Sequence, residues 1–217
     1  MAGEHKPQVS RTTRREFLKD TGLAAAGAAI LDGSAVFHGN ASAVTTEAVR
    51  EIGPGAVAVT LRVNGQPYTV QVEPRITLAD TLRLHLGLTG TKVSCDHGAC
   101  SSCTVLMDGL PINSCMTLTV EVGARTITTI EGMARGEELH PVQAAFVKHD
   151  AMQCGFCTPG MVMSCAALLE RKPRPALHEV REAISGNLCR CGCYTRICEA
   201  TLDAAEHIAA KRSVGGA

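Results

Sequence analysis

The chain has 217 residues, enough for one or two small domains. Lys plus Arg and Asp plus Glu both total 21, so the formal charge is zero, and we expect no nucleic-acid partner held by counterion release. The unusual feature is cysteine, because all 11 lie between Cys95 and Cys198. This density indicates disulfides, zinc or iron–sulfur ligation, and the odd number excludes pairing of every thiol within the chain.

Residues 1–43 carry the features of an export signal in the required order. Arg14 and Arg15 precede Phe-Leu-Lys, an apolar run covers Leu23–Leu31, and Ala41-Ser42-Ala43 offers a signal-peptidase site. The segment resembles a bacterial twin-arginine signal, so we expect folded export to the periplasm and cleavage after Ala43. The alternative is an amphipathic helix with a chance arginine pair. The apolar run falls far short of the roughly 20 residues that span a bilayer, so we expect no stable membrane span.

Residues 44–131 are predicted to form a small mixed sheet with one helix. Apolar residues alternate over Val57–Val63 and again over Tyr68–Val72, and Asn64-Gly65 between them predicts a hairpin. Thr77 is a predicted N-cap that opens the helix. The two further predicted strands cover Thr104–Met107 and Thr126–Thr129.

Residues 132–217 are predicted to be helical, with a linker from Gly132 to Pro141. Thr158 is the predicted N-cap of the second helix, followed by Pro159 in the first turn. The predicted helices cover 141–149, 160–171, 178–185 and 199–212. The chain is therefore expected to be α+β, with a small helical bundle after the sheet.

One set of four cysteines consists of Cys95, Cys100, Cys103 and Cys115. Its spacing, C-x4-C-x2-C and then a fourth cysteine from a separate strand end, is the plant-type [2Fe–2S] pattern. Three thiolates this close require a loop whose N–H groups face the sulfurs, with Gly98 suited to a positive φ. Zinc and disulfides are the alternatives, although structural zinc usually takes two separated ligand pairs.

A second set of four consists of Cys154, Cys157, Cys189 and Cys191, in the pattern C-x2-C and then C-x-C. Both pairs lie in loops next to predicted helices, so the four thiolates can converge at one end of the bundle. Spacing alone leaves both an iron–sulfur cluster and zinc open for this set. Three cysteines belong to neither set: Cys165, Cys193 and Cys198.

The segments around both sets resemble the two-cluster small subunit of the molybdenum hydroxylases, the family of xanthine dehydrogenase and aldehyde oxidoreductase. The resemblance covers nearly all of residues 57–210. Together with the export signal it is strongest to the iron–sulfur subunit of periplasmic aldehyde oxidoreductase. It implies a β-grasp ferredoxin-like domain followed by a four-helix-bundle domain, each with one [2Fe–2S] cluster. The segments that carry it are Cys95–Cys100, Ser102–Val105, Gln153–Gly160 and Ser185–Cys191.

Residue by residue, the resemblance implies that the first set binds an outer cluster and the second an inner cluster nearest the molybdenum cofactor. Gln153 is implied to hydrogen-bond the pterin, and Cys191 to approach the pterin amino group. The implied partners are a large molybdenum-cofactor subunit and an FAD subunit or a cytochrome acceptor. No catalytic or substrate site is expected on this chain.

The sequence departs from the family pattern in the outer loop and beside the inner set. Ser101-Ser102 stands where the family usually has Gly-Ala, and a positive φ at position 101 would cost Ser on the order of 1 kcal/mol. Cys193 stands where the family usually has no thiol and could compete as a ligand. Cys165 is expected to be a buried free thiol, and Cys198 has no assigned role.

The expected activity is one-electron relay, because the chain has no evident nucleotide fingerprint, catalytic triad or acid–base pair. The favoured function is the electron-transfer subunit of an exported molybdenum-dependent aldehyde oxidoreductase. One alternative is the small subunit of an isoquinoline-type N-heterocycle oxidoreductase that uses cytochrome c. Others are a free-standing ferredoxin-like carrier and a disulfide-rich exported structural protein.

Overall fold

The computed structural model describes residues 13, 15–17, 19 and 51–214, and its contacts divide the chain into residues 1–50 and 51–217. Most of the predicted export signal, including the apolar run and the cleavage site, lies outside the described residues. Within it, residues 15–17 and 19 are helical and exposed, and the Thr13 hydroxyl donates to Glu16 Oε2 at 2.8 Å. None of the described helices combines the length and apolar character that crossing a membrane requires.

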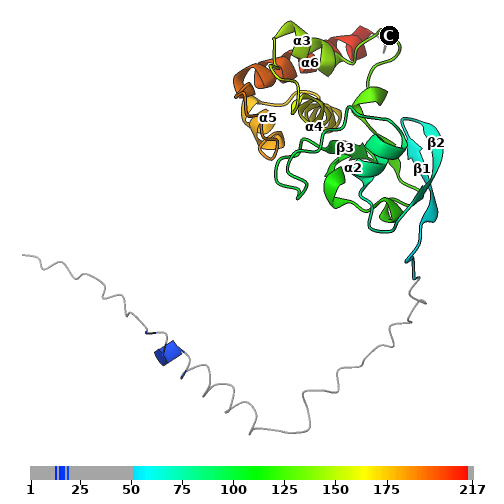
Figure 1. The fold of residues 1–217 in the computed structure, drawn as a ribbon. Coiled ribbons are helices and arrows are strands. Elements are labelled where there is room, and N and C mark those ends of the chain that lie inside the picture. Colours follow the sequence, from blue (N-terminus) through cyan, green and yellow to red (C-terminus); the bar gives the residue numbers. More distant parts are fainter. Residues whose placement is uncertain (1–12, 14, 18, 20–50, 215–217) are drawn as a thin grey trace, which may run out of the picture. The chain divides into compact units, whose positions relative to one another are not determined.

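The first part of the larger unit is a five-stranded mixed sheet in the order β2-β1-β5-β3-β4 (Figure 1). The predicted hairpin is confirmed: Val63 pairs with Gln66, and Asn64 and Gly65 have φ of 51° and 79°, the positive values of a type I′ turn. β1 also pairs in parallel with β5, and β3 pairs antiparallel with both β4 and β5. The strands are β1 (Val57–Val63), β2 (Gln66–Val72), β3 (Thr104–Met107), β4 (Leu110–Asn113) and β5 (Thr126–Thr128).

Strand β4 is absent from the sequence prediction. Asp108-Gly109 before it has φ of 50° and 80°, so it forms the same kind of turn as the first hairpin. Leu110 and Pro111 are exposed, which removes the apolar alternation by which a strand is recognised. A proline is tolerated there because β4 lies at an edge of the sheet.

One helical segment packs across the sheet. Thr77 caps it as predicted, since its hydroxyl oxygen accepts the N–H of Asp80 at 3.2 Å. The segment begins as α2 (Leu78–Asp80) and continues as the π-helical turn η1 (Thr81–His85). Short 3-10 turns cover Thr119–Glu121 and Ile130–Gly132. The buried core between sheet and helix consists of Leu61, Val63, Leu78, Leu82, Val105, Val122 and Ile127.

The second part contains the helices α3 (Pro141–Lys148), α4 (Thr158–Arg171), α5 (Leu177–Ala183) and α6 (Tyr194–Val214). The predicted N-cap Thr158 is wrong: the N-cap is Cys157, whose carbonyl accepts the N–H of Met161 at 3.0 Å. The helix therefore begins at Thr158 rather than at Gly160. α6 begins well before the predicted Glu199, because Ile197 and Cys198 are buried in the helical core.

Helix α4 joins the helical part to the sheet (Figure 1). Leu106 on β3 and Met163 and Ala167 on α4 form a buried apolar cluster, with exposures of 9%, 0% and 0%. The residues of this contact are buried like those in the core of the sheet part and in the core of the helical part. The two parts therefore form one compact unit over residues 51–217.

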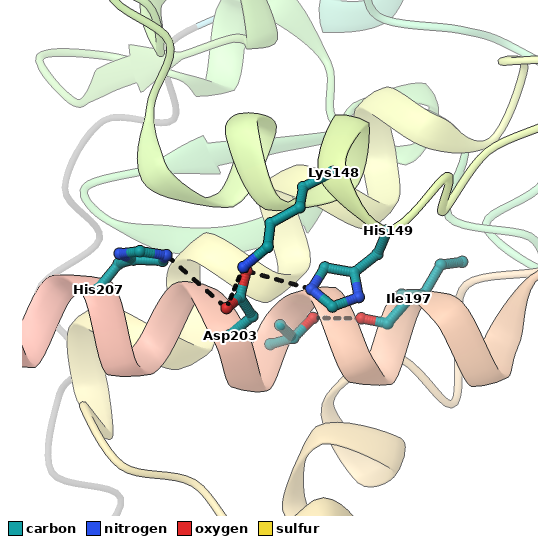
Figure 2. Close-up of polar contacts among 6 residues, drawn as sticks. Lys148, His149, Ile197, Asp203 and His207 are labelled. Atoms are coloured by element: carbon teal, nitrogen blue, oxygen red, sulfur yellow. Dashed lines mark hydrogen bonds and ion pairs between the residues drawn. The ribbon is translucent and has the colours of Figure 1, made fainter.

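A polar cluster at Asp203 fastens α3 to α6 (Figure 2). Lys148 Nζ lies 2.9 Å from both carboxylate oxygens of Asp203. The hydrogen bond from Lys148 lowers the pKa of Asp203, although burial acts to raise it. The buried His149 Nε2 lies 3.1 Å from Oδ2, close enough for an ion pair although its angle does not suit a hydrogen bond. His207 lies 3.7 Å from Oδ1, so the carboxylate is surrounded by cationic or ionisable groups.

Candidate metal centres

The first four-cysteine set converges at one end of the sheet. Cys95, Cys100 and Cys103 lie in the loop between η1 and β3, as their spacing predicted. Cys115 lies in a 3-10 turn, η2 (Ser114–Met116), directly after β4, so the fourth thiol arrives from a separate strand end. Three of these thiols are buried, and Cys95 is partly exposed.

The loop is folded tightly by three residues with positive φ: Asp96 (55°), Gly98 and Ser101. Gly98 has φ of 75°, and a Cβ there would lie 2.9 Å from Cγ of Met116, so the predicted need for glycine is confirmed. Asn113 Nδ2 donates to the Gly98 carbonyl at 3.0 Å and ties the loop to β4. Ser101 has φ of 54°, so this departure from the family pattern does hold a left-handed conformation.

The outer thiols are in contact with each other and with backbone N–H groups. The N–H of His97 lowers the pKa of the Cys95 thiol to about 6, and the Cys100 side chain acts in the same direction. Burial raises the pKa of Cys115 to about 12, and its contact with the Cys103 side chain adds to this effect. Cys95 therefore supplies a thiolate at neutral pH, the form that binds iron.

The second set lies where two helices begin. Cys154 and Cys157 directly precede α4, and Cys189 and Cys191 precede α6, so the predicted positions in loops next to helices are confirmed. Burial raises the pKa of Cys157 to about 12, and its contact with the Cys189 side chain adds to this effect. Cys154 is exposed.

A turn at Gly192, with φ of 76°, folds three N–H groups toward Cys189. Burial acts to raise the pKa of Cys189, but the N–H groups of Cys193, Cys191 and Gly192, together with the Cys157 side chain, lower it overall. Such a ring of donors stabilises a thiolate and also the negative sulfurs of a cluster.

The remaining sequence candidates lie in different surroundings. Gln153 is exposed beside Cys154. Cys193 is 7% exposed, and its side chain contacts that of Cys189. Cys165 is fully buried on α4 and accepts a hydrogen bond from the Thr201 hydroxyl at 3.1 Å, which confirms a buried free thiol. Cys198, for which the sequence predicts no role, contacts the side chain of Arg181.

The two sets meet across a small cavity of about 360 Å³. Its lining includes Cys100 from the first set and Cys154, Cys157 and Cys189 from the second. At the same place the N–H of Leu188 donates to the carbonyl of Cys100 at 3.0 Å. Leu188 directly precedes Cys189, so one hydrogen bond connects the backbones of the two thiol sets.

The donor sets suit binuclear iron–sulfur clusters. In the part of the chain that the structure describes, no three His, Cys, Asp or Glu side chains are grouped to hold a single metal ion. Six of the eight thiols lie in contacting pairs: Cys95 with Cys100, Cys103 with Cys115 and Cys157 with Cys189. A [2Fe–2S] cluster needs two thiolates at each of two irons, and the surrounding N–H donors offset its negative charge.

A mixed sheet with one set of four cysteines at its end, joined to helices with a second set, defines a protein that carries two iron–sulfur clusters. Two family models match accordingly: the 2Fe-2S iron-sulfur cluster binding domain over residues 61–126 and the [2Fe-2S] binding domain over residues 129–202. The chain is 42% identical to the aldehyde oxidoreductase iron-sulfur-binding subunit PaoA of Escherichia coli K12, covering 95% of this chain and 93% of that protein.

A second relative is the nicotine 6-hydroxylase small subunit of Paenarthrobacter nicotinovorans, 50% identical over 71% of this chain and 93% of the relative. Among solved structures, quinoline 2-oxidoreductase from Pseudomonas putida 86 matches with a TM-score of 0.69 and 47% identity, covering 72% of this chain and 97% of that one. The chain belongs to the iron–sulfur small subunits of the molybdenum hydroxylases. It is an electron-transfer subunit of a multi-subunit oxidoreductase whose molybdenum cofactor resides on a large partner subunit.

Proposed function

We propose that this chain relays electrons from the molybdenum centre of an exported aldehyde oxidoreductase to FAD on a further subunit or to an external acceptor. Cys154, Cys157, Cys189 and Cys191 hold the inner cluster, and Cys95, Cys100, Cys103 and Cys115 hold the outer one. We further propose that the sheet is a β-grasp ferredoxin domain and that α3–α6 form a four-helix bundle. Each bound [2Fe–2S] cluster accepts and releases one electron.

The observation that carries the proposal is the hydrogen bond from the Leu188 N–H to the Cys100 carbonyl, at 3.0 Å. Cys189 of the inner set is covalently next to the donor, and Cys100 of the outer set bears the acceptor. Thiol side chains of both sets also line one cavity, so little protein separates the two sites. A short bonded path between two metal sites is what successive one-electron transfer requires.

The exposure of the thiols supports the proposed direction of transfer, from a partner's cofactor to the inner set first. Cys154 is exposed and Cys191 and Cys157 are half-buried, whereas three outer thiols are buried, so a partner's cofactor can approach the inner set closely. Gln153 is exposed beside Cys154, a position from which its amide can hydrogen-bond a pterin. Such an amide offers both a donor and an acceptor.

Export in the folded state supports the same function. The twin-arginine pathway proposed for residues 1–43 carries folded proteins, so clusters can be inserted before the chain meets the periplasm. A chain exported unfolded would expose eleven thiols to disulfide formation.

An N-heterocycle oxidoreductase is the second candidate. It is favoured by the 50% identity to a nicotine 6-hydroxylase small subunit and the 47% identity to quinoline 2-oxidoreductase. For that candidate the proposed acceptor is a cytochrome rather than FAD. Both candidates use the same electron relay in this chain, so they are distinguished by the substrate that the partner subunit oxidises.

The test is to purify the tagged full-length chain with whatever co-purifies, measure iron, and record EPR spectra during reductive titration. We expect about four iron atoms per chain, two distinguishable reduced [2Fe–2S] signals and a large molybdenum-containing partner. Anaerobic addition of an aldehyde should then reduce both clusters, whereas reduction by quinoline-type rings alone would favour the second candidate. One cluster plus zinc, or a partner-free monomer, would refute the proposal.

A further inference from the structure

The residue between two outer thiols adopts a backbone conformation that its side chain disfavours. Ser101 lies between Cys100 and Cys103 and has φ of 54°. The left-handed region is open to glycine but unfavourable for residues with a Cβ. Something in the surrounding structure must therefore hold this turn.

The carbonyl of Ser101 is the point at which the turn is held. It accepts the Thr104 N–H at 3.3 Å and the Thr104 hydroxyl at 2.7 Å, both from the same loop. It also accepts Asn187 Nδ2 at 3.1 Å, from the loop between α5 and α6 that carries Cys189 and Cys191 of the inner set. The third donor thus comes from the other half of the molecule, 86 residues away in the sequence.

Asn187 is itself held firmly. Its side chain is buried, with 4% exposure, and its Oδ1 accepts the hydroxyl of Ser164 on α4 at 3.0 Å. Because a carbonyl oxygen only accepts, the amide must present Nδ2 to Ser101, and the Ser164 hydroxyl then donates to Oδ1. Gly160 on the same helix leaves room for the contact, since a Cβ there would lie 2.3 Å from the Ser101 carbonyl oxygen.

We propose that Asn187 is a positioning residue for the outer cluster, which holds the left-handed turn at Ser101 and thereby the spacing of Cys100 and Cys103. The inference rests on the ligand set proposed above. Hydrogen bonds and solvent access around the sulfurs set a cluster's potential and spectrum, so a loosened turn changes both. The outer cluster thus depends on a side chain from the inner cluster's loop.

The proposal predicts a specific genetic rescue. Removing the donor by Asn187→Ala leaves the turn at Ser101 held only by the two Thr104 hydrogen bonds from its own loop, so Ser101 can leave its unfavourable conformation more easily. Glycine adopts φ near 54° without that penalty, so Ser101→Gly should hold the turn even when the donor is absent. If Asn187 instead mattered only through its hydrogen bond to Ser164 on α4, a glycine at position 101 would not restore the outer cluster in the double variant.

The experiment compares wild type, N187A, S101G, the S101G/N187A double variant and S185A in the complete complex with the full-length chain. Ser185 is the matched control, because it is an exposed residue of the same loop whose hydroxyl donates only to the carbonyl of Glu182. The readouts are the EPR signal and midpoint potential of each cluster, and the rate of iron loss to a chelator.

We expect N187A to alter the EPR signal of the outer cluster and to leave that of the inner cluster unchanged. Iron loss from the outer site should become about fivefold faster, because that is the factor that corresponds to the net free energy of one hydrogen bond. S101G/N187A should return to wild-type values, and S185A should not differ from wild type. An unchanged outer cluster in N187A, equal change at both clusters, or a double variant no better than N187A would each overturn the proposal. A wild-type protein without two [2Fe–2S] signals would instead refute the ligand set itself.

Discussion

Replacing Gly160 by alanine sets helix propensity directly against a tertiary contact. Gly160 lies in the first turn of α4, where alanine is favoured over glycine by up to about 1 kcal/mol. A Cβ at this position would lie 2.3 Å from the Ser101 carbonyl oxygen and 3.1 Å from that of Ser102. Both neighbours are backbone atoms of the cysteine loop, so no side-chain rotation can relieve the contact.

The expected net effect is destabilisation. Overpacking of a well-packed site costs about 1–3 kcal/mol, and the short contact at Gly160 places this substitution at the upper end of that range. After the gain in helix propensity, we expect a net loss of about 2 kcal/mol in the free energy of unfolding. For a domain of this size that corresponds to a melting temperature lower by about 4–8 °C.

The assay is differential scanning calorimetry of the iron-loaded protein, with all variants at one protein concentration and one scan rate. Gly55→Ala is the control, because a Cβ there meets no atom within 4 Å and its φ is not positive. We expect Gly55→Ala to change the melting temperature by no more than about 1–2 °C. A Gly160→Ala protein as stable as wild type, or more stable, would show that propensity outweighs the contact and that the junction is looser than described.

Three further predictions concern the thiols and the pterin contact. Cys191→Ala should lose the inner EPR signal while Cys193→Ala keeps about four iron atoms per chain, and the reverse result would make Cys193 the ligand. In iron-free protein, alkylation of Cys95 by iodoacetamide should rise with pH through a midpoint near 6, because its pKa is lowered to about 6 and the thiolate is the reactive form. The fully buried Cys165, with its pKa raised by burial to about 12, should stay unmodified at neutral pH, and equal labelling of both thiols would contradict the assignment. Gln153→Ala should lower molybdenum-cofactor retention with both cluster signals intact, and loss of the inner signal would instead mean a structural role.

Several elements could be predicted because their cause is local. The hairpin at Asn64-Gly65 depends on two residues that accept positive φ between alternating runs, and both properties can be read within a dozen positions. The cap at Thr77 is equally local. The loop around Cys95–Cys103 follows from three thiols spaced too closely for a helix or a strand to present them together.

Other elements could not be predicted because their cause lies elsewhere in the chain. β4 shows little apolar alternation, since its first residues are exposed, and it exists because β3 offers it hydrogen bonds. The first turns of α6 carry weak helix formers, and burial of Ile197 in the helical core stabilises them. The N-cap of α4 is decided by which carbonyl accepts the N–H of Met161, which residue preference does not specify.

The sequence by itself determined which ligands this protein offers: two sets of four closely spaced thiols, one on a sheet and one on helices, of which the first has the plant-type [2Fe–2S] spacing. Ligand type and local spacing are properties of neighbouring residues, so they can be read from the sequence. Only the tertiary structure decided how the two sets are joined. The hydrogen bonds from Leu188 to Cys100 and from Asn187 to Ser101, and the space that Gly160 leaves, connect residues far apart in the chain. Such contacts depend on how α4 packs against the sheet, and no local pattern of residues encodes that packing.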